Sequence, residues 1–358
     1  MTANSPQNYV LSQRGRSRVD FLIELGLLAR ELEIQADTHA RDVGLDTRSS
    51  TADPEQLGKH IAPVMFALPD FRLFRLVREW QLAQHGRIAT EAFDEIRGDL
   101  EAGLQALQDG ETSIRYAKNP APPAYWDGYE FHRSTGGWDG HDYMGFVHGE
   151  IIHRRMVGDT FAGIIMRQRS DAALAAPVNN PKNILELGCG SGQYTMSLAA
   201  TYPEAELWAC DLSRKQLEQA QRRANYHGHR WHLFEAAAED TQLEAGYFDL
   251  VTSYAMFHEL PVTAILATMQ EAFRLLKPGG SFFIADVTPY HVQDDYSCWK
   301  ADLLNYVQGG DPYWREYAQC NLAGLAEETG LLNVDWSAAN EQQYPFYLRA
   351  NKPTALNS

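Results

Sequence analysis

The stretch from residue 183 to residue 193 constrains the fold of this chain most, because a short apolar run meets a glycine-rich turn there. Residues 183–187 predict a β-strand, and glycines follow at positions 188, 190 and 192. Glycine has no Cβ and readily takes positive φ. A ligand can therefore lie against the turn, with the free N–H groups of the next helix directed at it. That helix is predicted over residues 194–202.

The segments that follow continue the alternation of strand and helix. A second apolar run over residues 206–210 ends in Asp211, about twenty residues after the last glycine, where a βαβ unit places an acid against a ribose. Further strands are predicted over 248–253 and 281–286, and Pro278 with two glycines is expected to end the helix between them. The order predicts an α/β fold.

Four motifs then stand in order: Glu-Leu-Gly-Cys-Gly-Ser-Gly from residue 186, Asp211, Phe-Asp-Leu-Val from residue 248 and Leu-Lys-Pro-Gly-Gly from residue 276. Together they resemble the class I S-adenosylmethionine-dependent methyltransferases of the small-molecule type. Gly-x-Gly-x-Gly differs from the Gly-x-Gly-x-x-Gly of nicotinamide enzymes. The resemblance implies S-adenosylmethionine as cofactor and a Rossmann-like seven-stranded methyltransferase sheet with helices on both faces. Residues 330–336 and 344–350 are expected to close it as an antiparallel pair.

The 358 residues exceed one minimal domain, so we predict three parts. Residues 1–120 form a mainly helical domain for dimerisation, for capping the substrate, or only for packing. Residues 121–180 form a linker or lid and a helix over 142–169. Residues 181–358 form the methyltransferase domain, with an aromatic insertion at about 288–317. In the N-terminal part we expect helices over 19–42, from Pro54, over 71–84 and over 88–107, with a break at residues 85 and 86.

Composition limits the partners. The net charge of −16 repels phosphate backbones, which disfavours nucleic acid as substrate. The four cysteines form no Cys-x-x-Cys pair, which fits free thiols in a reducing cytosol. The first ten residues have no apolar signal-peptide core, and no early apolar run is long enough to span a membrane. We therefore expect a cytoplasmic protein without a membrane partner.

The resemblance assigns cofactor-binding roles to residues near the glycine turn. Glu186 would orient the loop and the amino group, Gly188, Gly190 and Gly192 would let the backbone approach, Asp211 would hold the ribose, and Leu212 would pack on the adenine. Ala237 stands where the family often has an adenine-binding Asp, so the N–H of Ala238 and the carboxylate of Glu239 are substitutes. Ser253 and Tyr254 lie at the end of the strand that begins at residue 248, and they are further candidates for cofactor binding.

The segment before the first strand usually covers the methionine end of the cofactor in this family. The candidates there, by resemblance, are Tyr129, His132, Arg133, Tyr143 and Arg155. An arginine at this place could pair with the cofactor's carboxylate in bidentate fashion.

By resemblance, the groups that contact the methyl acceptor are expected directly after the strand over residues 248–253. His258 beside Glu259 is either a base with an orienting partner or a helix start that supports the cofactor pocket. His148 is a further catalytic candidate. His148 and His153 are five residues apart, which does not place them on one face of an α-helix, and there is no His-Glu-x-x-His motif, so no catalytic metal is expected.

The predicted function is transfer of a methyl group from S-adenosylmethionine to an O or C atom of a hydrophobic or aromatic small molecule. Nucleobase-type Asn/Asp-Pro-Pro-Tyr and Pro-Cys motifs are absent, and aromatic residues after Asp286 could wall an acceptor site. A non-catalytic or repurposed cofactor-binding subunit and a protein or peptide methyltransferase are the alternatives. The acceptor and the oligomeric state, including a homodimer, stay open.

Overall fold

The computed structural model describes residue 6 and residues 8–49, 52–118 and 121–354. Residues 119 and 120, at the first predicted domain boundary, lie outside this described part. Within it, no helix combines the length and the apolar character that a membrane crossing requires. All four cysteines are free thiols, as the sequence predicts.

The described strands form one eight-stranded sheet in the order β1-β4-β3-β2-β5-β6-β8-β7. Strands β1 to β6 are parallel in this order, and β8 runs antiparallel to both β6 and β7. The predicted α/β class and the antiparallel closure are therefore confirmed. The strand bounds are β1 Ser113–Arg115, β2 Asn183–Leu187, β3 Glu206–Asp211, β4 His232–Glu235, β5 Phe248–Tyr254, β6 Leu276–Asp286, β7 Leu332–Ala338 and β8 Phe346–Asn351.

The eighth strand is β1, which the sequence did not reveal. It is only three residues long and comes from the part predicted to be helical. It is held at the edge by long-range hydrogen bonds: Thr112 Oγ1 donates to the carbonyl of His229 (2.9 Å) and accepts from the N–H of Trp231 (3.0 Å). A strand this short has no periodicity of its own, because its pairing with β4 alone defines it.

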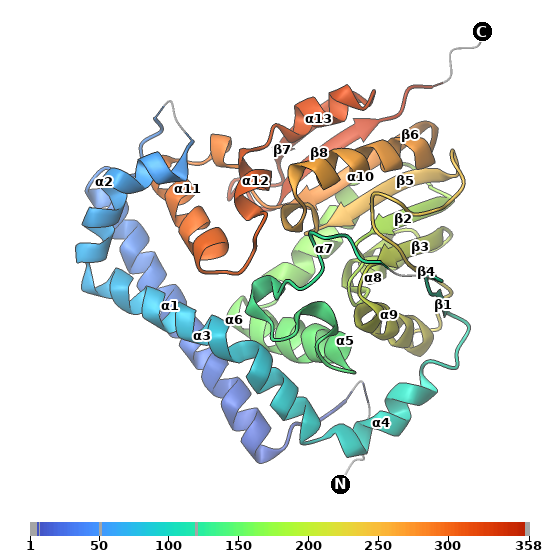
Figure 1. Ribbon diagram of the computed structural model, residues 1–358, viewed down its shortest axis with the longest axis horizontal. Helices are drawn as coiled ribbons and strands as arrows, with labels where there is room; N and C mark the ends of the chain where they lie inside the picture. The colour runs from blue at the N-terminus through green and yellow to red at the C-terminus, as the bar shows by residue number, and fades with distance from the viewer. Residues whose placement is uncertain (1–5, 7, 50–51, 119–120, 355–358) are drawn as a thin grey trace.

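Helices cover both faces of the sheet, as predicted (Figure 1). Ile184, Leu207 and Leu250 pack on one face against α7 (Ile164–Ala175), α8 (Gln193–Thr201) and α9 (Arg214–Tyr226). The alternate residues Leu185 and Val251 face α10 (Val262–Leu275) and α13 (Leu322–Glu328) on the other. Helix α10 already ends at Leu275, and β6 begins at Leu276, so Pro278 lies within the strand rather than at the helix end.

The N-terminal part contains α1 (Gln13–Asp42), α2 (Pro54–Ala67), α3 (Pro69–Asp94) and α4 (Arg97–Ala106), and α1 packs along α3 (Figure 1). The predicted break at residues 85 and 86 is wrong, because α3 runs through it. Gly86 lies against the backbone of another segment instead: a Cβ there would be 3.4 Å from Ser134 Cα. The glycine thus permits a close approach and does not end the helix.

The chain after β6 connects the sheet to these helices. It contains η5 (Tyr290–Val292), α11 (Asp295–Ala301), η6 (Asp302–Val307) and α12 (Trp314–Gln319). Trp299 stacks near Phe66 and Phe71, and Lys300 pairs with Glu33 (3.0 Å) and Asp37 (2.6 Å) on α1. The aromatic segment therefore packs on the N-terminal helices.

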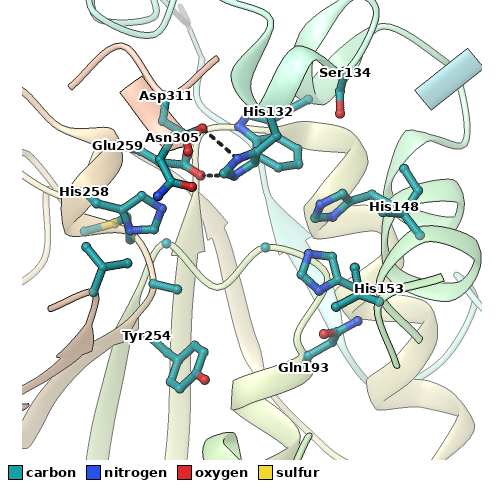
Figure 2. Close-up of a pocket in the computed structure, with 18 of the residues that line it drawn as sticks. His132, Ser134, His148, His153, Gln193, Tyr254, His258, Glu259, Asn305 and Asp311 are labelled. Carbon is teal, nitrogen blue, oxygen red and sulfur yellow. Dashed lines mark hydrogen bonds and ion pairs between the residues drawn. The ribbon is translucent and has the colours of Figure 1, made fainter. Parts of the chain in front are cut away.

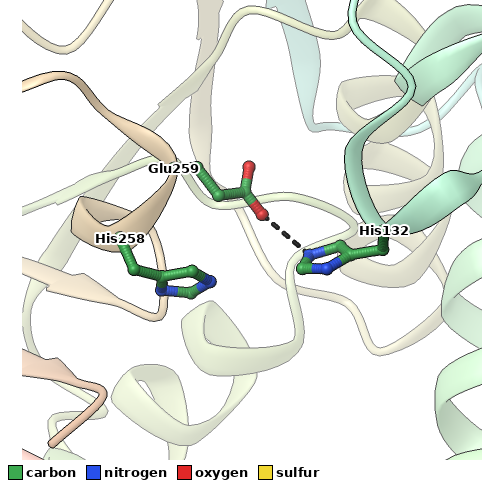
Figure 3. Close-up of side chains that lie close together, drawn as sticks. All are labelled: His132, His258 and Glu259. Atoms are coloured by element: carbon green, nitrogen blue, oxygen red, sulfur yellow. Dashed lines mark hydrogen bonds and ion pairs between the residues drawn. The ribbon is translucent and has the colours of Figure 1, made fainter. Parts of the chain in front are cut away.

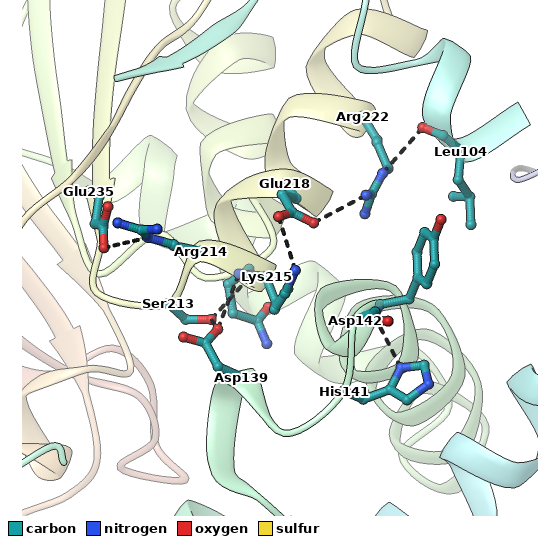
Figure 4. A network of polar contacts seen from close by, with 12 residues as sticks. Leu104, Asp139, His141, Asp142, Ser213, Arg214, Lys215, Glu218, Arg222 and Glu235 are labelled. Atoms are coloured by element: carbon teal, nitrogen blue, oxygen red, sulfur yellow. Dashed lines mark hydrogen bonds and ion pairs between the residues drawn. The ribbon is translucent and has the colours of Figure 1, made fainter. Parts of the chain in front are cut away.

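The segment before β2 is irregular. It contains η1 (Phe131–Arg133), η2 (Gly137–Asp139), α5 (Met144–Phe146), the π-helix η3 (Val147–Val157) and α6 (Gly158–Thr160). The continuous helix predicted over 142–169 is wrong, since Ala162 and Gly163 take positive φ (48° and 73°) and separate α6 from α7. Figure 4 shows how the segment is anchored on α9: Asp139 Oδ1 accepts from Ser213 Oγ (2.6 Å) and from the N–H of Lys215 (3.2 Å).

Candidate functional site

A cavity of about 620 Å³ lies between the carboxyl ends of β2, β3 and β5 and the helices α1 and α3. Its wall joins the glycine turn, Asp211 and the end of β5 to the segment 131–161. Figure 2 shows the polar side chains of this cavity, with His132, His258 and Glu259 at one side and His148, His153 and Gln193 at the other. Segments far apart in the sequence therefore meet in one site.

The three glycines of the turn all have positive φ, of 68°, 51° and 76° at positions 188, 190 and 192. A Cβ on Gly188 would lie 2.4 Å from Met256 Sδ, so no other residue fits there. Gly188 and Gly190 line the cavity. Gly192 lies behind the turn, where a Cβ would be 3.0 Å from the ring of Trp231. Two glycines thus expose backbone to the cavity, and the third allows close packing beneath it.

Two carboxyl groups lie beside this turn. Asp211 accepts from the N–H groups of Gly190 and Ser213, both at 2.8 Å, and desolvation by the surrounding protein raises the pKa of Asp211 to about 6. Glu186 accepts from Thr195 Oγ1 at 2.5 Å, and burial raises the pKa of Glu186 to about 8. A ligand that offers hydroxyl or ammonium groups would offset this loss of hydration.

Arg169 of α7 is a buried cation that lines the cavity beside the same turn. Its guanidinium lies over the ring of Tyr254 (5.6 Å) and 3.4 Å from His153 Nδ1. Among the described residues it forms no ion pair with an acid, and burial lowers the pKa of Arg169. An unpaired buried guanidinium is a ready partner for a carboxylate. Sequence reasoning did not identify Arg169, because Arg167 stands two residues earlier in the same helix and only the fold shows which of the two is buried.

The arginines and tyrosines considered from the sequence lie elsewhere. Arg155 pairs with Asp20 at 2.7 Å, and Arg133 Nη1 donates to the carbonyl of Gln308 at 3.4 Å. Tyr143 packs against Phe93, and its hydroxyl donates to Glu101 at 3.0 Å. Tyr129 packs edge-on against Tyr313. Of the five candidates, His132 alone is in the cavity wall as the structure describes it.

The remaining predicted cofactor residues divide into two groups. Leu212, Ala238 and Tyr254 line the cavity in the described structure, whereas Ala237, Glu239 and Ser253 do not. Glu239 accepts from the hydroxyl of Tyr125 (2.8 Å), which itself lines the cavity. Ser253 Oγ donates to the carbonyl of Leu187 (2.9 Å) and so ties β5 to the end of β2.

His258 and Glu259 both face the cavity from η4 (Phe257–Glu259), but they do not pair with each other. His258 Nδ1 lies 2.7 Å from Asp286 Oδ1. Burial alone would lower the pKa of His258, and Asp286 raises it above its ordinary value. Glu259 Oε1 instead contacts His132 Nε2 at 3.0 Å. The partner of His258 is thus the acid that ends β6, a position that sequence reasoning did not connect with it.

His132 lies between two carboxylates. Its Nε2 faces Glu259, and its Nδ1 is 2.7 Å from Asp311 Oδ1. Although desolvation lowers it, the pKa of His132 is raised well above its ordinary value by these two acids. Asp311 is 4% exposed.

His148 and His153 also face the cavity, and their ring centroids are 4.5 Å apart. The sequence argument separated them because it assumed an α-helix. They lie in the π-helix η3, whose hydrogen bonds join residues five apart. Desolvation lowers the pKa of His148 well below its ordinary value and that of His153 to about 3. Both are therefore neutral bases at physiological pH.

The far wall is largely apolar. It comes from α1, α3, η3 and the aromatic segments and includes Leu22, Ala29, Phe74, Leu82, Trp126, Trp138, Ile152, Met156, Phe161 and Trp314. Arg78 interrupts it. The buried Nε of Arg78 has no hydrogen-bond partner among the described residues, and desolvation lowers the pKa of Arg78.

A parallel sheet with this strand order, a glycine turn after its central strand and an acid at the end of the next strand define a nucleotide-binding α/β fold of the Rossmann-like type. Residues 184–280 match a family model described as a methyltransferase domain. This match identifies a methyltransferase domain over residues 184–280 and agrees with the class I S-adenosylmethionine-dependent methyltransferases that the motifs predict.

Several curated methyltransferases are similar to part of this chain. A malonyl-[acyl-carrier protein] O-methyltransferase of Legionella pneumophila is 29% identical over 34% of this chain and 42% of its own length. One from Geobacter sulfurreducens is 28% identical over 54% and 74%. A ubiquinone biosynthesis O-methyltransferase of Aromatoleum aromaticum is 33% identical over 30% and 44%. The chain thus spans less than half of two of these relatives.

Proposed function

We propose that this protein transfers a methyl group from S-adenosylmethionine to an oxygen or carbon atom of a hydrophobic or aromatic small molecule. The observation that carries the proposal is the single cavity, which runs from the glycine turn and Asp211 to an apolar and aromatic wall. One end suits a nucleoside with an amino-acid tail, and the other suits a mostly apolar acceptor.

The residues at the first end fit the cofactor. Backbone at Gly188 and Gly190 would approach it, Asp211 would accept from the ribose hydroxyls, and Leu212 and Ala238 would flank the adenine. Glu186 would bind the ammonium group, and Arg169 would pair with the carboxylate. When bound, S-adenosylmethionine supplies an electrophilic methyl group on a sulfonium. The protein fixes its orientation and excludes water.

The acceptor end supports a bulky apolar substrate with few polar groups. Aromatic and aliphatic side chains of α1, α3 and η3 form most of it. We propose that residues 1–120 act mainly as a cap on this end, that residues 121–180 act as a lid, and that residues 181–358 form the methyltransferase domain.

Arg78, with its unpartnered Nε, would receive an acidic group of the acceptor. The three relatives named above are O-methyltransferases, which supports an oxygen atom as one candidate for the methyl acceptor.

The three predicted catalytic residues all line this cavity, His258 and Glu259 on one side and His148 on the other. An acceptor hydroxyl must lose its proton when the methyl group is transferred. His258 is held by Asp286 through Nδ1, which leaves Nε2 as the atom that could hydrogen-bond an acceptor. We propose that this cluster orients the hydroxyl and takes up its proton, a contribution of typically about 10²–10⁴-fold in rate.

The test begins with binding. Calorimetry with S-adenosylmethionine and S-adenosylhomocysteine should give saturable 1:1 binding to the wild type and a large loss with Asp211→Ala. Labelled methyl transfer to a panel of aromatic acids, phenols and acyl thioesters then identifies the acceptor. Absence of binding to folded wild type, with and without the panel, would overturn the proposal.

A further inference from the structure

We propose that His132, His258 and Glu259 form a binding site for a divalent first-row transition-metal ion inside the cavity. One ligand atom from each of the three side chains lies within 4.8 Å of the others. Figure 3 shows the two imidazoles and the carboxylate directed toward a common point, with His132 approaching from η1 and the other two from η4. Two histidines and one carboxylate suit such ions.

Both histidines are oriented by carboxylates that stand behind them. Asp286 Oδ1 accepts a hydrogen bond from Nδ1 of His258 at 2.7 Å. Asp311 Oδ1 forms an ion pair with Nδ1 of His132 at 2.7 Å, outside hydrogen-bonding geometry. Each ring therefore presents Nε2 to the third ligand. Metal-binding histidines almost always have such a partner on the nitrogen that does not bind the metal, because it fixes the tautomer and the ring orientation.

The spacing supports the same conclusion. His132 Nε2 and Glu259 Oε1 are 3.0 Å apart, the separation of two atoms that share a proton. It is also the separation of neighbouring metal ligands, because two bonds of about 2.1 Å at a right angle place their ends about 3.0 Å apart. An ion could replace the shared proton without moving this pair. The 4.8 Å limit for the whole set is wider than in a loaded site, so a bound ion would draw His258 inward.

The backbone at the site is held in a costly conformation. His132 and Arg133 have φ of 52° and 56°, a region that residues with a side chain seldom adopt. Gly310 lies directly against this turn, since a Cβ on it would be 2.9 Å from the N of Arg133. His132 is therefore held in a sparsely populated backbone conformation, as is common at functional sites.

Three protein ligands leave further coordination positions on the ion. These positions face the same cavity in which the proposed acceptor would bind. Water or an oxygen donor of the acceptor would fill them. A bound ion would occupy Nε2 of His258 in place of an acceptor hydroxyl, so His258 would not act as the base in the metal-bound form. The test below measures ion binding alone and therefore stands or falls separately from methyl transfer.

The test is a titration of the full chain, purified without a histidine tag and stripped with a chelator, with Co²⁺. We expect visible d–d bands that saturate at one equivalent and that Zn²⁺ removes by competition. Glu259→Gln and His132→Ala should each weaken Co²⁺ binding at least about tenfold, and Asp311→Asn should weaken it by about 10–100-fold, because it removes only the orienting partner.

The matched control is His141→Gln. His141 lies on the same segment and also contacts an acid, Asp94 Oδ1 at 3.1 Å, but it is outside the cavity wall. Its Co²⁺ affinity should equal that of the wild type. Circular dichroism and S-adenosylhomocysteine binding on the same samples verify that each variant is folded. Absence of a saturable band in the wild type, or equal affinity in folded Glu259→Gln, would overturn the metal site while leaving the cofactor site intact.

Discussion

The two ends of the cavity are built in different ways. The cofactor end comes mostly from one stretch of chain, in which β2, the glycine turn, α8 and β3 follow one another (Figure 1). The acceptor end is assembled from α1, α3, η3, η4 and the segment around Asp311, which are separated by up to hundreds of residues. The geometry of the cofactor end therefore follows from local backbone conformation. The geometry of the acceptor end depends on how elements distant in the sequence pack together.

If this distinction holds, a substitution in the backbone of the glycine turn should reduce cofactor binding more than any other single substitution. Gly188→Ala places a Cβ 2.4 Å from Met256 Sδ at a φ of 68°. We expect S-adenosylhomocysteine affinity to fall more than about 100-fold and stability to fall by about 1–3 kcal/mol from overpacking and strain. Calorimetry and thermal melting measure both.

Gly228→Ala is the control for Gly188→Ala. Gly228 has the same φ of 68°, but nothing lies within 4 Å of an added Cβ. The free energy of unfolding of Gly228→Ala should fall by only about 1 kcal/mol, the cost of the left-handed conformation, and S-adenosylhomocysteine should bind normally. Equal behaviour of the two variants would mean that backbone strain, and not the approach of Met256, governs the turn.

The second-largest loss of cofactor binding should come from Arg169, in the helix α7 that precedes β2. Arg169→Gln removes the buried cation that we assign to the ligand carboxylate. S-adenosylhomocysteine should bind about 30–100-fold more weakly, since a charged hydrogen bond contributes about 1.5–3 kcal/mol. Arg155→Gln, whose partner is Asp20, should bind normally.

A second ligand makes the assignment of Arg169 specific. 5′-Methylthioadenosine has no carboxylate, so its affinity should be the same in wild type and Arg169→Gln. A parallel loss for both ligands would show instead that Arg169 supports the shape of the pocket.

The pH dependence of binding tests the carboxyl groups at the same end. In the free protein, burial raises the pKa of Glu186 from 4.5 to about 8 and desolvation raises that of Asp211 from 3.8 to about 6. Ligand groups that bind the ionised carboxylates must displace these protons, so S-adenosylhomocysteine affinity should rise on the order of 100-fold between pH 6 and 8. Calorimetry at both pH values measures this, and Glu186→Gln should flatten the rise.

The same groups fix the sign of the effect on stability. A carboxyl whose pKa is raised on folding is favoured in its protonated form. The ligand-free fold should therefore lose stability as the pH rises from about 4.5 towards 8 because of Glu186. Thermal melts of wild type should show this slope more strongly than those of Glu186→Gln. An opposite slope would mean that Glu186 is ionised in the free protein.

The extent of sequence prediction follows the same division. The alternation of strands and helices, the positive φ of the glycines and the place of Asp211 at a strand end follow from local patterns and were predicted. The contacts of His132 with Glu259 and Asp311, of His258 with Asp286, and of His148 with His153 were not. The first two join residues far apart in the chain. The third depends on a π-helix, where a spacing of five brings side chains together, and α-helical periodicity hides that spacing.

The smallest effect should come from Arg78, at the assembled end. Its Nε has no partner among the described residues, so it contributes little to folding in the absence of an acceptor. Arg78→Met should leave S-adenosylhomocysteine affinity within about twofold and keep Tm within about 1 °C of wild type or raise it.

Arg75, on the same helix, provides the contrast for Arg78. Its guanidinium lies 4.6 Å from the centre of the Phe66 ring, a contact that contributes about 0.5–1 kcal/mol. Arg75→Met should therefore lower Tm, while Arg78→Met should not. An equal loss in both variants would assign Arg78 to folding rather than to the acceptor. Opposite responses would establish that two neighbouring arginines of α3 have different roles, Arg75 in folding and Arg78 in the binding cavity.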